Sequence, residues 1–333
     1  MGKLSDSYGR RPLLILSQLS TLISFVVLGF ANSLALIFIS RAIDGILGSN
    51  YTIAQAYLTD ITPAKDRTRI FSISGVAFSI GFFIGPALGG YLSQFSYALP
   101  SFLAAAVTAI TILTTYLYLP ETVKKKESFQ WSWDIFKLEQ FKLLTAEAKV
   151  SFPLWEFFLY VLAHGIFTSN FALYAEKQIG MNASDVGYLF AIIGASSILI
   201  KLVILPQLLK ILSENKLRVI GALTIIGALS MLPFIYTKWL ATLSTVLFSF
   251  GASNLRPSLI SHISKQASNK SYGATMGIAN SLGSVSNIVG PLIGGFLLQN
   301  FFPGSLGLMA AGTMTLGLGL MIIERQLRLK SSR

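Results

Sequence analysis

Residues Gly85–Leu92 read GPALGGYL, and residues Gly290–Leu297 read GPLIGGFL. The two copies keep the first glycine, the proline and the glycine pair in register. Each copy lies late in an apolar run that is long enough to cross a bilayer. A motif that recurs at corresponding places of two long apolar segments predicts two parallel repeats of membrane-spanning helices.

Apolar runs of about 20 residues, the length that a bilayer core requires, follow one another along the whole chain. The composition is also typical of a membrane protein, because 53% of the 333 residues are hydrophobic and only 12% are charged. We predict an all-α membrane protein with ten transmembrane helices, over residues 13–31, 34–58, 70–93, 98–119, 152–174, 186–209, 219–236, 240–263, 275–298 and 305–323.

Charge and cysteine content exclude other classes of protein. Lys and Arg outnumber Asp and Glu by 26 to 14, but they stand between apolar runs and not on one polar face, so we expect no nucleic-acid partner. The absence of cysteine excludes disulfides, thiolate metal sites and cysteine nucleophiles. The chain also has no Walker-type loop for ATP. We therefore expect no enzyme, no metal and no cofactor.

The basic residues also predict the orientation of the chain in the membrane. Lys177 and Lys238 lie in loops on one side, and Arg41, Lys201 and Arg256 lie within spans. All the others lie in the segments on the opposite side, together with both ends of the chain. By the positive-inside rule, we expect a multi-pass protein of the cell membrane with both termini in the cytoplasm.

Residues 120–150 interrupt the apolar pattern with three consecutive lysines and the aromatic-rich sequence SFQWSWDIF. We interpret this segment as a cytoplasmic linker with a short interfacial helix. It separates an N-terminal half, residues 1–119 with four spans, from a C-terminal half, residues 151–333 with six. Equal repeats would require two more helices before residue 1, so we expect an N-terminally truncated protein that lacks its first two helices.

Small residues line one face of each repeated helix, where they let the backbone of a neighbouring helix come close. A proline in each copy removes an amide donor and bends the helix. Close packing alone would explain any single glycine, but the unit repeated in register favours a helix-packing hinge that is used in a conformational cycle. The residues of this hinge are Gly81, Gly85, Pro86, Gly89, Gly90, Gly290, Pro291, Gly294 and Gly295.

Residues Gly2–Pro12, GKLSDSYGRRP, resemble the signature loop between helices 2 and 3 of the major facilitator superfamily. The repeated Gly-Pro-x-x-Gly-Gly is similar to the helix 5 motif of the proton-driven drug antiporters in that superfamily. Arg41 with Asp44 resembles the helix 4 motif, and residues 56–69, AYLTDITPAKDRTR, resemble the tetracycline-efflux-like branch. The resemblance implies a helical bundle equivalent to helices 3 to 12 of a twelve-helix drug:proton antiporter.

The opening loop predicts a cytoplasmic gating motif, which comprises Gly2, Asp6, Gly9, Arg10, Arg11 and Asp60. The resemblance implies that Arg10 pairs with Asp60 at the end of the second span. Asp6 is expected near a helix start at Ser271, whose partial positive charge favours a carboxylate. The alternative is a solvated turn that serves only the topology.

Polar residues at membrane depth are candidates for proton coupling and for the substrate cavity: Arg41, Asp44, His164, Asn170 and Arg256. A charge in the bilayer costs at least about 2.5 kcal/mol, so Arg41 and Asp44 are expected to face a cavity or each other. In the first case the resemblance implies that Asp44 exchanges the coupling proton; in the second case the two form a structural ion pair.

Three further residues leave two interpretations open. His164 either exchanges protons or is a neutral buried histidine, and Asn170 is expected to share its face. Arg256, just before Pro257, either faces a cavity or extends its side chain to the membrane surface. Glu156 is expected to be an interfacial group.

We therefore predict a transporter that moves small organic molecules by alternating access, most simply as proton-coupled efflux of drug-like or amphipathic compounds. Its partners would be a small-molecule substrate, protons and the lipid bilayer, and the complete protein would be monomeric. The alternatives are a uniporter or importer of a small solute such as a sugar or an organic acid, and a truncated membrane protein that does not transport.

Overall fold

The computed structural model describes residues 2–63, 66–123, 148–266 and 272–331, and all the regular structure in these ranges is helical. The helices up to residue 123 are α1 (Gly2–Tyr8), α2 (Arg10–Gly29), α3 (Leu34–Leu47), α4 (Asn50–Ile61), α5 (Arg67–Ser93) and α6 (Leu99–Tyr118). Those from residue 148 are α9 (Ala148–Ile179), α10 (Ala183–Leu199), η3 (Ile200–Ile204), α11 (Leu205–Ile211), α12 (Glu214–Ser230), η4 (Leu232–Phe234), α13 (Lys238–Gln266), α14 (Tyr272–Asn300) and α15 (Ser305–Ser331). The predicted all-α fold class is confirmed.

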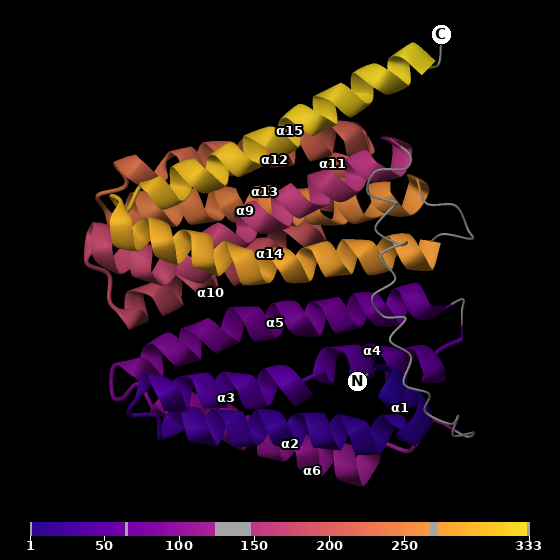
Figure 1. Ribbon diagram of the computed structural model, residues 1–333, viewed down its shortest axis with the longest axis vertical. Coiled ribbons are helices and arrows are strands. Elements are labelled where there is room, and N and C mark those ends of the chain that lie inside the picture. The colour runs from indigo at the N-terminus through magenta and orange to yellow at the C-terminus, as the bar shows by residue number, and fades with distance from the viewer. Residues whose placement is uncertain (1, 64–65, 124–147, 267–271, 332–333) are drawn as a thin grey trace. The chain divides into compact units, whose positions relative to one another are not determined.

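The chain forms two compact units, residues 1–133 and 134–333. In the first unit, indigo to purple in Figure 1, α2 packs against α3, α4 and α6, and α1 packs against α2. In the second unit, magenta to yellow in Figure 1, α9 packs against α14 and α15, and α12 packs against α13 and α15. The linker helix expected between them lies outside the described residues, as does Ser271.

Most of the buried apolar side chains belong to the second unit, and α9 contributes the largest of them. Phe167 and Phe171 of α9 are 1% exposed, and the ring centroid of Phe167 lies 4.5 Å from that of Phe248 in α13. Aromatic side chains bury much apolar area, and α9 therefore forms the centre of this unit.

Eight helical stretches of the described chain are long and apolar enough to cross a membrane. Six of the eight coincide with predicted spans to within a few residues at most ends, and two are longer: α9 covers 152–174, and α10 with η3 and α11 covers 186–209. The two predicted spans outside this set, 34–58 and 240–263, are also helical.

The predicted span 34–58 is not one continuous helix, because the chain breaks between α3 and α4. The Gly48 amide donates to the Asp44 carbonyl oxygen at 2.5 Å, and the next amide, of Ser49, donates to Ser17 Oγ of α2 at 2.6 Å. A Cβ atom at position 48 would collide with the same Asp44 carbonyl, so glycine is required there. The break leaves polar groups of α3 and α4 facing α2.

The predicted span 240–263 lies inside α13, which has 29 residues but carries many polar ones. Several of these, such as Ser249, Asn254 and His262, are buried in the second unit. Asn254 Nδ2, for example, donates to the Phe250 carbonyl oxygen at 2.9 Å. The helix is therefore long enough to span a membrane, while the buried polar side chains in it face other helices.

Candidate functional site

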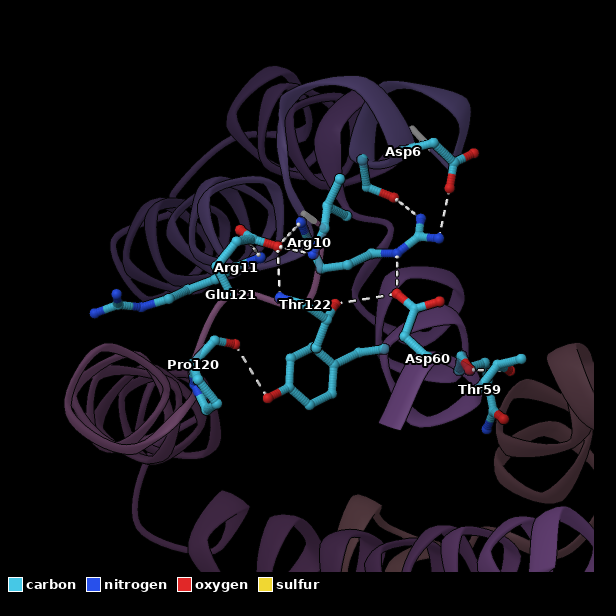
Figure 2. Close-up of polar contacts among 12 residues, drawn as sticks. Asp6, Arg10, Arg11, Thr59, Asp60, Pro120, Glu121 and Thr122 are labelled. Atoms are coloured by element: carbon cyan, nitrogen blue, oxygen red, sulfur yellow. Dashed lines mark hydrogen bonds and ion pairs between the residues drawn. The ribbon is translucent and has the colours of Figure 1, made fainter. Parts of the chain in front are cut away.

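The opening motif forms a sharp turn between two helices, and Gly9 makes that turn. Gly9 has φ 107° and ψ 145°, a conformation that is essentially restricted to glycine. It ends α1 and starts α2, so that Asp6 in α1 and Arg10 in α2 lie on the same side of the turn (Figure 2). Gly2 is the first residue of α1.

Arg10 holds three parts of the first unit together through its guanidinium group. Its Nε donates to Asp60 Oδ2 at 2.9 Å, its Nη1 donates to Ser5 Oγ at 2.6 Å, and its Nη2 lies 2.5 Å from Asp6 Oδ1. The Arg10 side chain is only 11% exposed. The pairing of Arg10 with Asp60, near the end of α4, is confirmed, and the turn is thus more than a solvated loop.

Glu121, just after α6, closes the same network from a distant part of the sequence. Its carboxylate accepts the backbone amides of Arg10 at 2.9 Å and Arg11 at 3.2 Å, which begin α2, and those of Thr122 at 2.9 Å and Val123 at 3.0 Å. The first amides of a helix lack partners within the helix and favour a negative charge. Because Gly9 has no side chain to cap α2, Glu121 does so instead.

The chemistry of this network is electrostatic. Burial raises the pKa of Glu121, but the backbone hydrogen bonds from Val123, Arg10, Arg11 and Thr122 lower it more, so that the pKa lies below its usual value. The Thr122 hydroxyl also donates to Asp60 Oδ2 at 3.0 Å, which joins Glu121's loop to α4 (Figure 2). Asp6, Arg10, Asp60 and Glu121 are called the Arg10 network below.

The sequence pattern does not single out Glu121, and it predicts Arg11 to belong to the same motif as Arg10. The signal for Glu121 was its position directly after the fourth predicted span, at the same membrane edge as the opening loop. The side chain of Arg11 instead contacts α6: its Nη2 donates to the Tyr116 carbonyl oxygen, and its guanidinium lies 5.1 Å from the Tyr116 ring centroid. The two neighbouring arginines thus fasten α2 to two different helices.

Arg41 and Asp44 of α3 contact α2 and not each other. Arg41 Nη2 donates to Ser24 Oγ at 2.9 Å and to Ser40 Oγ at 3.1 Å. Asp44 Oδ1 accepts from the Thr21 hydroxyl at 2.7 Å. Among the described residues no ion pair joins Arg41 to Asp44, so the alternative of a structural ion pair between them is wrong. Asp44 lies one turn before the break that follows α3.

His164 and Asn170 of α9 face different neighbours. The His164 ring lies 5.5 Å from the ring centroid of Phe248 in α13, whereas Asn170 Nδ2 donates to the Pro291 carbonyl oxygen of α14 at 3.4 Å. The expectation that they share one face is wrong, because a separation of six residues places two side chains about 120° apart around a helix. Asn170 is 8% exposed and packs in the helix interface.

Arg256 lies beside a second cation. Ser249 Oγ donates to the Ile193 carbonyl oxygen at 3.2 Å, and Ser253 Oγ lies 3.1 Å from Ser197 Oγ, so α13 and α10 run in a constant register. Continued along the two helices, this register brings Arg256 to within one residue of the level of Lys201, which lies in the π-helical turn η3, and the two positive charges are close enough to interact. Both side chains are exposed in the structure. Irregular π turns occur often at functional sites.

The two copies of the predicted hinge differ in their packing. In α14, a Cβ atom on Gly290 would lie 2.9 Å from the Gly165 backbone, and one on Gly294 would collide with the Asn170 amide, so α9 and α14 are in close contact. In α5, no described atom lies within 4 Å of a Cβ built on Gly81, Gly85 or Gly89.

Pro86 and Pro291 are inside continuous helices of 27 and 29 residues, beside the paired glycines that end in Gly90 and Gly295. Neither proline therefore breaks its helix. Among the described residues, no group of three His, Cys, Asp or Glu is arranged to hold a metal ion.

Comparisons with known proteins agree with this architecture. The family model described as Major Facilitator Superfamily matches residues 1–291. The chain is 28% identical to the class H tetracycline resistance protein of Pasteurella multocida over 317 residues, which are 93% of this chain and 78% of that protein. It is also 28% identical to multidrug resistance protein 2 of Bacillus subtilis (strain 168) over 332 residues, 98% of this chain and 82% of that one.

Solved structures show the same fold. The crystal structure of the human organic anion transporter MFSD10 matches with a TM-score of 0.69 and 22% identity, over 96% of this chain and 79% of that one. The crystal structure of a mutant of the peptide transporter POT matches with a TM-score of 0.76 and 14% identity, over 99% and 82% of the two chains.

Proposed function

Because the chain belongs to the Major Facilitator Superfamily, we propose that it exports drug-like, amphipathic organic compounds across the cell membrane in exchange for protons. Multi-pass membrane transport follows from the family itself. Drug export is supported by the tetracycline and multidrug resistance proteins, which match nearly the whole chain. The use of protons is supported by the resemblance of the repeated Gly-Pro-x-x-Gly-Gly motif to that of proton-driven drug antiporters. The positive-inside pattern supports cytoplasmic termini, and the complete protein would act as a monomer.

The environment of Asp44 is the observation that best supports proton coupling. Its carboxylate accepts a hydrogen bond from the Thr21 hydroxyl at 2.7 Å, and no cation among the described residues pairs with it. An ionised carboxylate at membrane depth is costly unless it is paired. A proton can therefore neutralise Asp44 without breaking an ion pair, and Asp44 is the residue we assign to the coupling proton.

Arg41 and the break after α3 would link this proton to the conformation of the first unit. The Arg41 guanidinium is held by Ser24 and Ser40, so its positive charge stays on the same helix as Asp44 and close to it in sequence. The carboxylate lies one turn before the break, where the Ser49 amide donates to Ser17 Oγ of α2 and not to its own helix. Gain or loss of a proton then shifts the balance between inward-open and outward-open states.

The remaining predicted residues have four roles in this cycle. The Arg10 network would hold the cytoplasmic end of the first unit closed in one state, and the Gly-Pro units of α5 and α14 would serve as packing hinges. His164 and Arg256 would line the substrate cavity of the second unit. Asn170 stabilises the contact between α9 and α14.

Transport into proteoliposomes tests this proposal. The complete protein is purified and reconstituted, a pH gradient is imposed, and the accumulation of tetracycline and of ethidium is followed by fluorescence. We expect uphill accumulation that a protonophore abolishes. Asp44→Asn should abolish uphill accumulation while ligand binding, measured by fluorescence titration, persists.

The matched control is Asp185→Asn, which removes a carboxylate of the second unit that pairs with Lys238 at 2.7 Å. It should retain uphill transport. Equilibration of substrate without any response to the pH gradient would instead identify a uniporter. Undiminished gradient-driven transport by Asp44→Asn would place the coupling proton on another residue.

A further inference from the structure

Two cations lie deep within long helices of the second unit. Arg256 is the only lysine, arginine, aspartate or glutamate in the predicted span 240–263, and Lys201 is the only one in the predicted span 186–209. Each is followed by ten more residues of its helical stretch, which ends at Gln266 or Ile211. Ten residues of helix are about 15 Å long, half the thickness of a hydrocarbon core. Both charges therefore belong to the interior of a span and not to its end.

Arg256 interacts electrostatically with groups from two other elements. Its charge is close enough to act on Lys201 in η3 and on the side chains of His164 and Tyr160 in α9. The ring centroids of Tyr160 and His164 are 6.0 Å apart, and the His164 ring also contacts Phe248 of α13. A guanidinium, an ammonium, an imidazole and a phenol thus lie in one region of the second unit. We call Arg256, Lys201, His164 and Tyr160 the Arg256 site.

No carboxylate of the described part of the second unit compensates these two cations. Neither Arg256 nor Lys201 has a hydrogen bond or an ion pair within the described chain. Glu176 is exposed and lies twelve residues, about 18 Å of helix, beyond His164. The other four carboxylates described there already contact cations: Asp185 contacts Lys238, Glu214 contacts Lys265, and Glu156 and Glu324 contact Arg218.

The charged groups that follow Arg256 along α13 lie on another side of that helix. Glu156 is 0% exposed and pairs with Arg218 at 3.2 Å, so the expectation that Glu156 is an interfacial group is wrong. Arg218 also contacts Glu324, whose carboxylate lies 2.9 Å from His262 Nε2. His262 follows Arg256 by six residues, which places the two side chains about 120° apart around the helix. This group is therefore separate from the Arg256 site.

An anion would stabilise the Arg256 site in two ways. An unpaired charge within a membrane is costly and typically marks a substrate pathway, and two neighbouring positive charges also repel each other. Two cations that extended separately to the membrane surface would move apart, but Arg256 and Lys201 remain close enough to interact. A planar guanidinium can donate two parallel hydrogen bonds to one carboxylate, and an ammonium adds a second positive charge.

We propose that the Arg256 site binds the carboxylate or sulfonate group of an amphipathic organic anion, so that the compounds carried by this protein include organic anions. The proposal rests on the proposed function, because it takes the site to lie on the transport pathway. Arg256 and Lys201 bind the anionic group, and the hydroxyl of Tyr160 and the ring N–H of His164 are further donors beside them. The apolar part of the compound contacts the otherwise uncharged spans around these two cations.

Equilibrium binding of two matched compounds tests the site. The complete protein is purified in a non-ionic detergent at about pH 7, and the binding of radiolabelled naphthalene-2-carboxylate is compared with that of naphthalene-2-carboxamide. The two have nearly the same shape, but only the first is an anion. We expect the carboxylate to bind at least about tenfold more tightly, because a hydrogen bond to a charged group is worth a factor of roughly ten to a hundred. Equal affinities for the natural protein overturn the proposal, whatever the variants do.

Substitutions then locate the site. Arg256→Gln and Lys201→Gln should each remove most of the preference for the carboxylate, whereas Arg256→Lys should retain part of it because the cation remains. The matched control is Lys210→Gln, which removes an exposed lysine nine residues beyond Lys201 and should leave the preference unchanged. A preference that persists in both Arg256→Gln and Lys201→Gln would show that another part of the protein binds the anion.

An anionic lipid headgroup has the same charge as such a compound, so phosphatidylglycerol is added in a separate series. Displacement of the carboxylate by phosphatidylglycerol, and not by phosphatidylcholine, would identify a lipid site and overturn the proposal. Because binding is measured without a pH gradient, its result is independent of proton coupling. Loss of uphill tetracycline accumulation together with an intact preference for the carboxylate would refute the proposed function and not the anion site.

Discussion

Replacing Gly9 by alanine tests whether the start of α2 is closed by Glu121. The backbone at Gly9, with φ 107°, costs about 2 kcal/mol for a residue that has a Cβ. That Cβ would lie 2.5 Å from Glu121 Oε2, so the carboxylate must move away from the amides of Arg10 and Arg11. Loss of this helix cap adds about 1 kcal/mol. We expect a total destabilisation of about 3 kcal/mol.

The assay is unfolding of the full chain in detergent micelles, followed by tryptophan fluorescence and circular dichroism. Gly180→Ala is the matched control. Gly180 also has a positive φ, of 71°, but no described atom lies within 4 Å of a Cβ at that position. Gly180→Ala should lower the free energy of unfolding only by the cost of a left-handed backbone for a residue with a Cβ, about 1 kcal/mol.

A double-mutant cycle separates the two contributions. In a Glu121→Ala background no carboxylate is displaced, so Gly9→Ala should cost only about 2 kcal/mol, and the two substitutions should be non-additive by about 1 kcal/mol. Equal effects of Gly9→Ala with and without Glu121, or an effect no larger than that of Gly180→Ala, would refute the role of Glu121 as the cap of α2.

Three other outcomes can be measured. The fold lowers the pKa of Glu121, so the carboxylate contributes its full stabilisation above the usual pKa of about 4.3, and this stabilisation is lost as the pH falls through the lowered value. Unfolding measured at decreasing pH should show this loss in the natural chain and not in Glu121→Gln. Gly294→Ala should destabilise the second unit by about 1–3 kcal/mol in thermal unfolding, since its Cβ collides with Asn170, whereas Gly295→Ala, 3.9 Å from Asn170 Oδ1, should be nearly neutral. Glu156→Ala leaves Arg218 without one buried partner and should cost about 3–5 kcal/mol, whereas Glu214→Ala removes an exposed ion pair and should cost at most about 1 kcal/mol in denaturant titration.

The helices, their order and the pairing of Arg10 with Asp60 could be predicted from the sequence. Apolar runs and small-residue spacing are local properties, and a helix satisfies its own backbone hydrogen bonds within one segment. The opening motif is also local, except for Asp60, whose partner was indicated by a resemblance to known transporters. These features therefore appear in the residues themselves before any packing is considered.

Only the tertiary structure decided which polar groups meet. Glu121 caps a helix that begins 111 residues earlier, and the break after α3 depends on Ser17 of a different helix. The sequence does not predict the ion pair between Glu156 and Arg218, because hydropathy indicates how polar a residue is and not which residue it pairs with. An unpaired amide at a helix end or a buried charge needs a partner, and that partner can belong to any helix that packs nearby. The identity of the partner is therefore decided only when helices distant in sequence pack together.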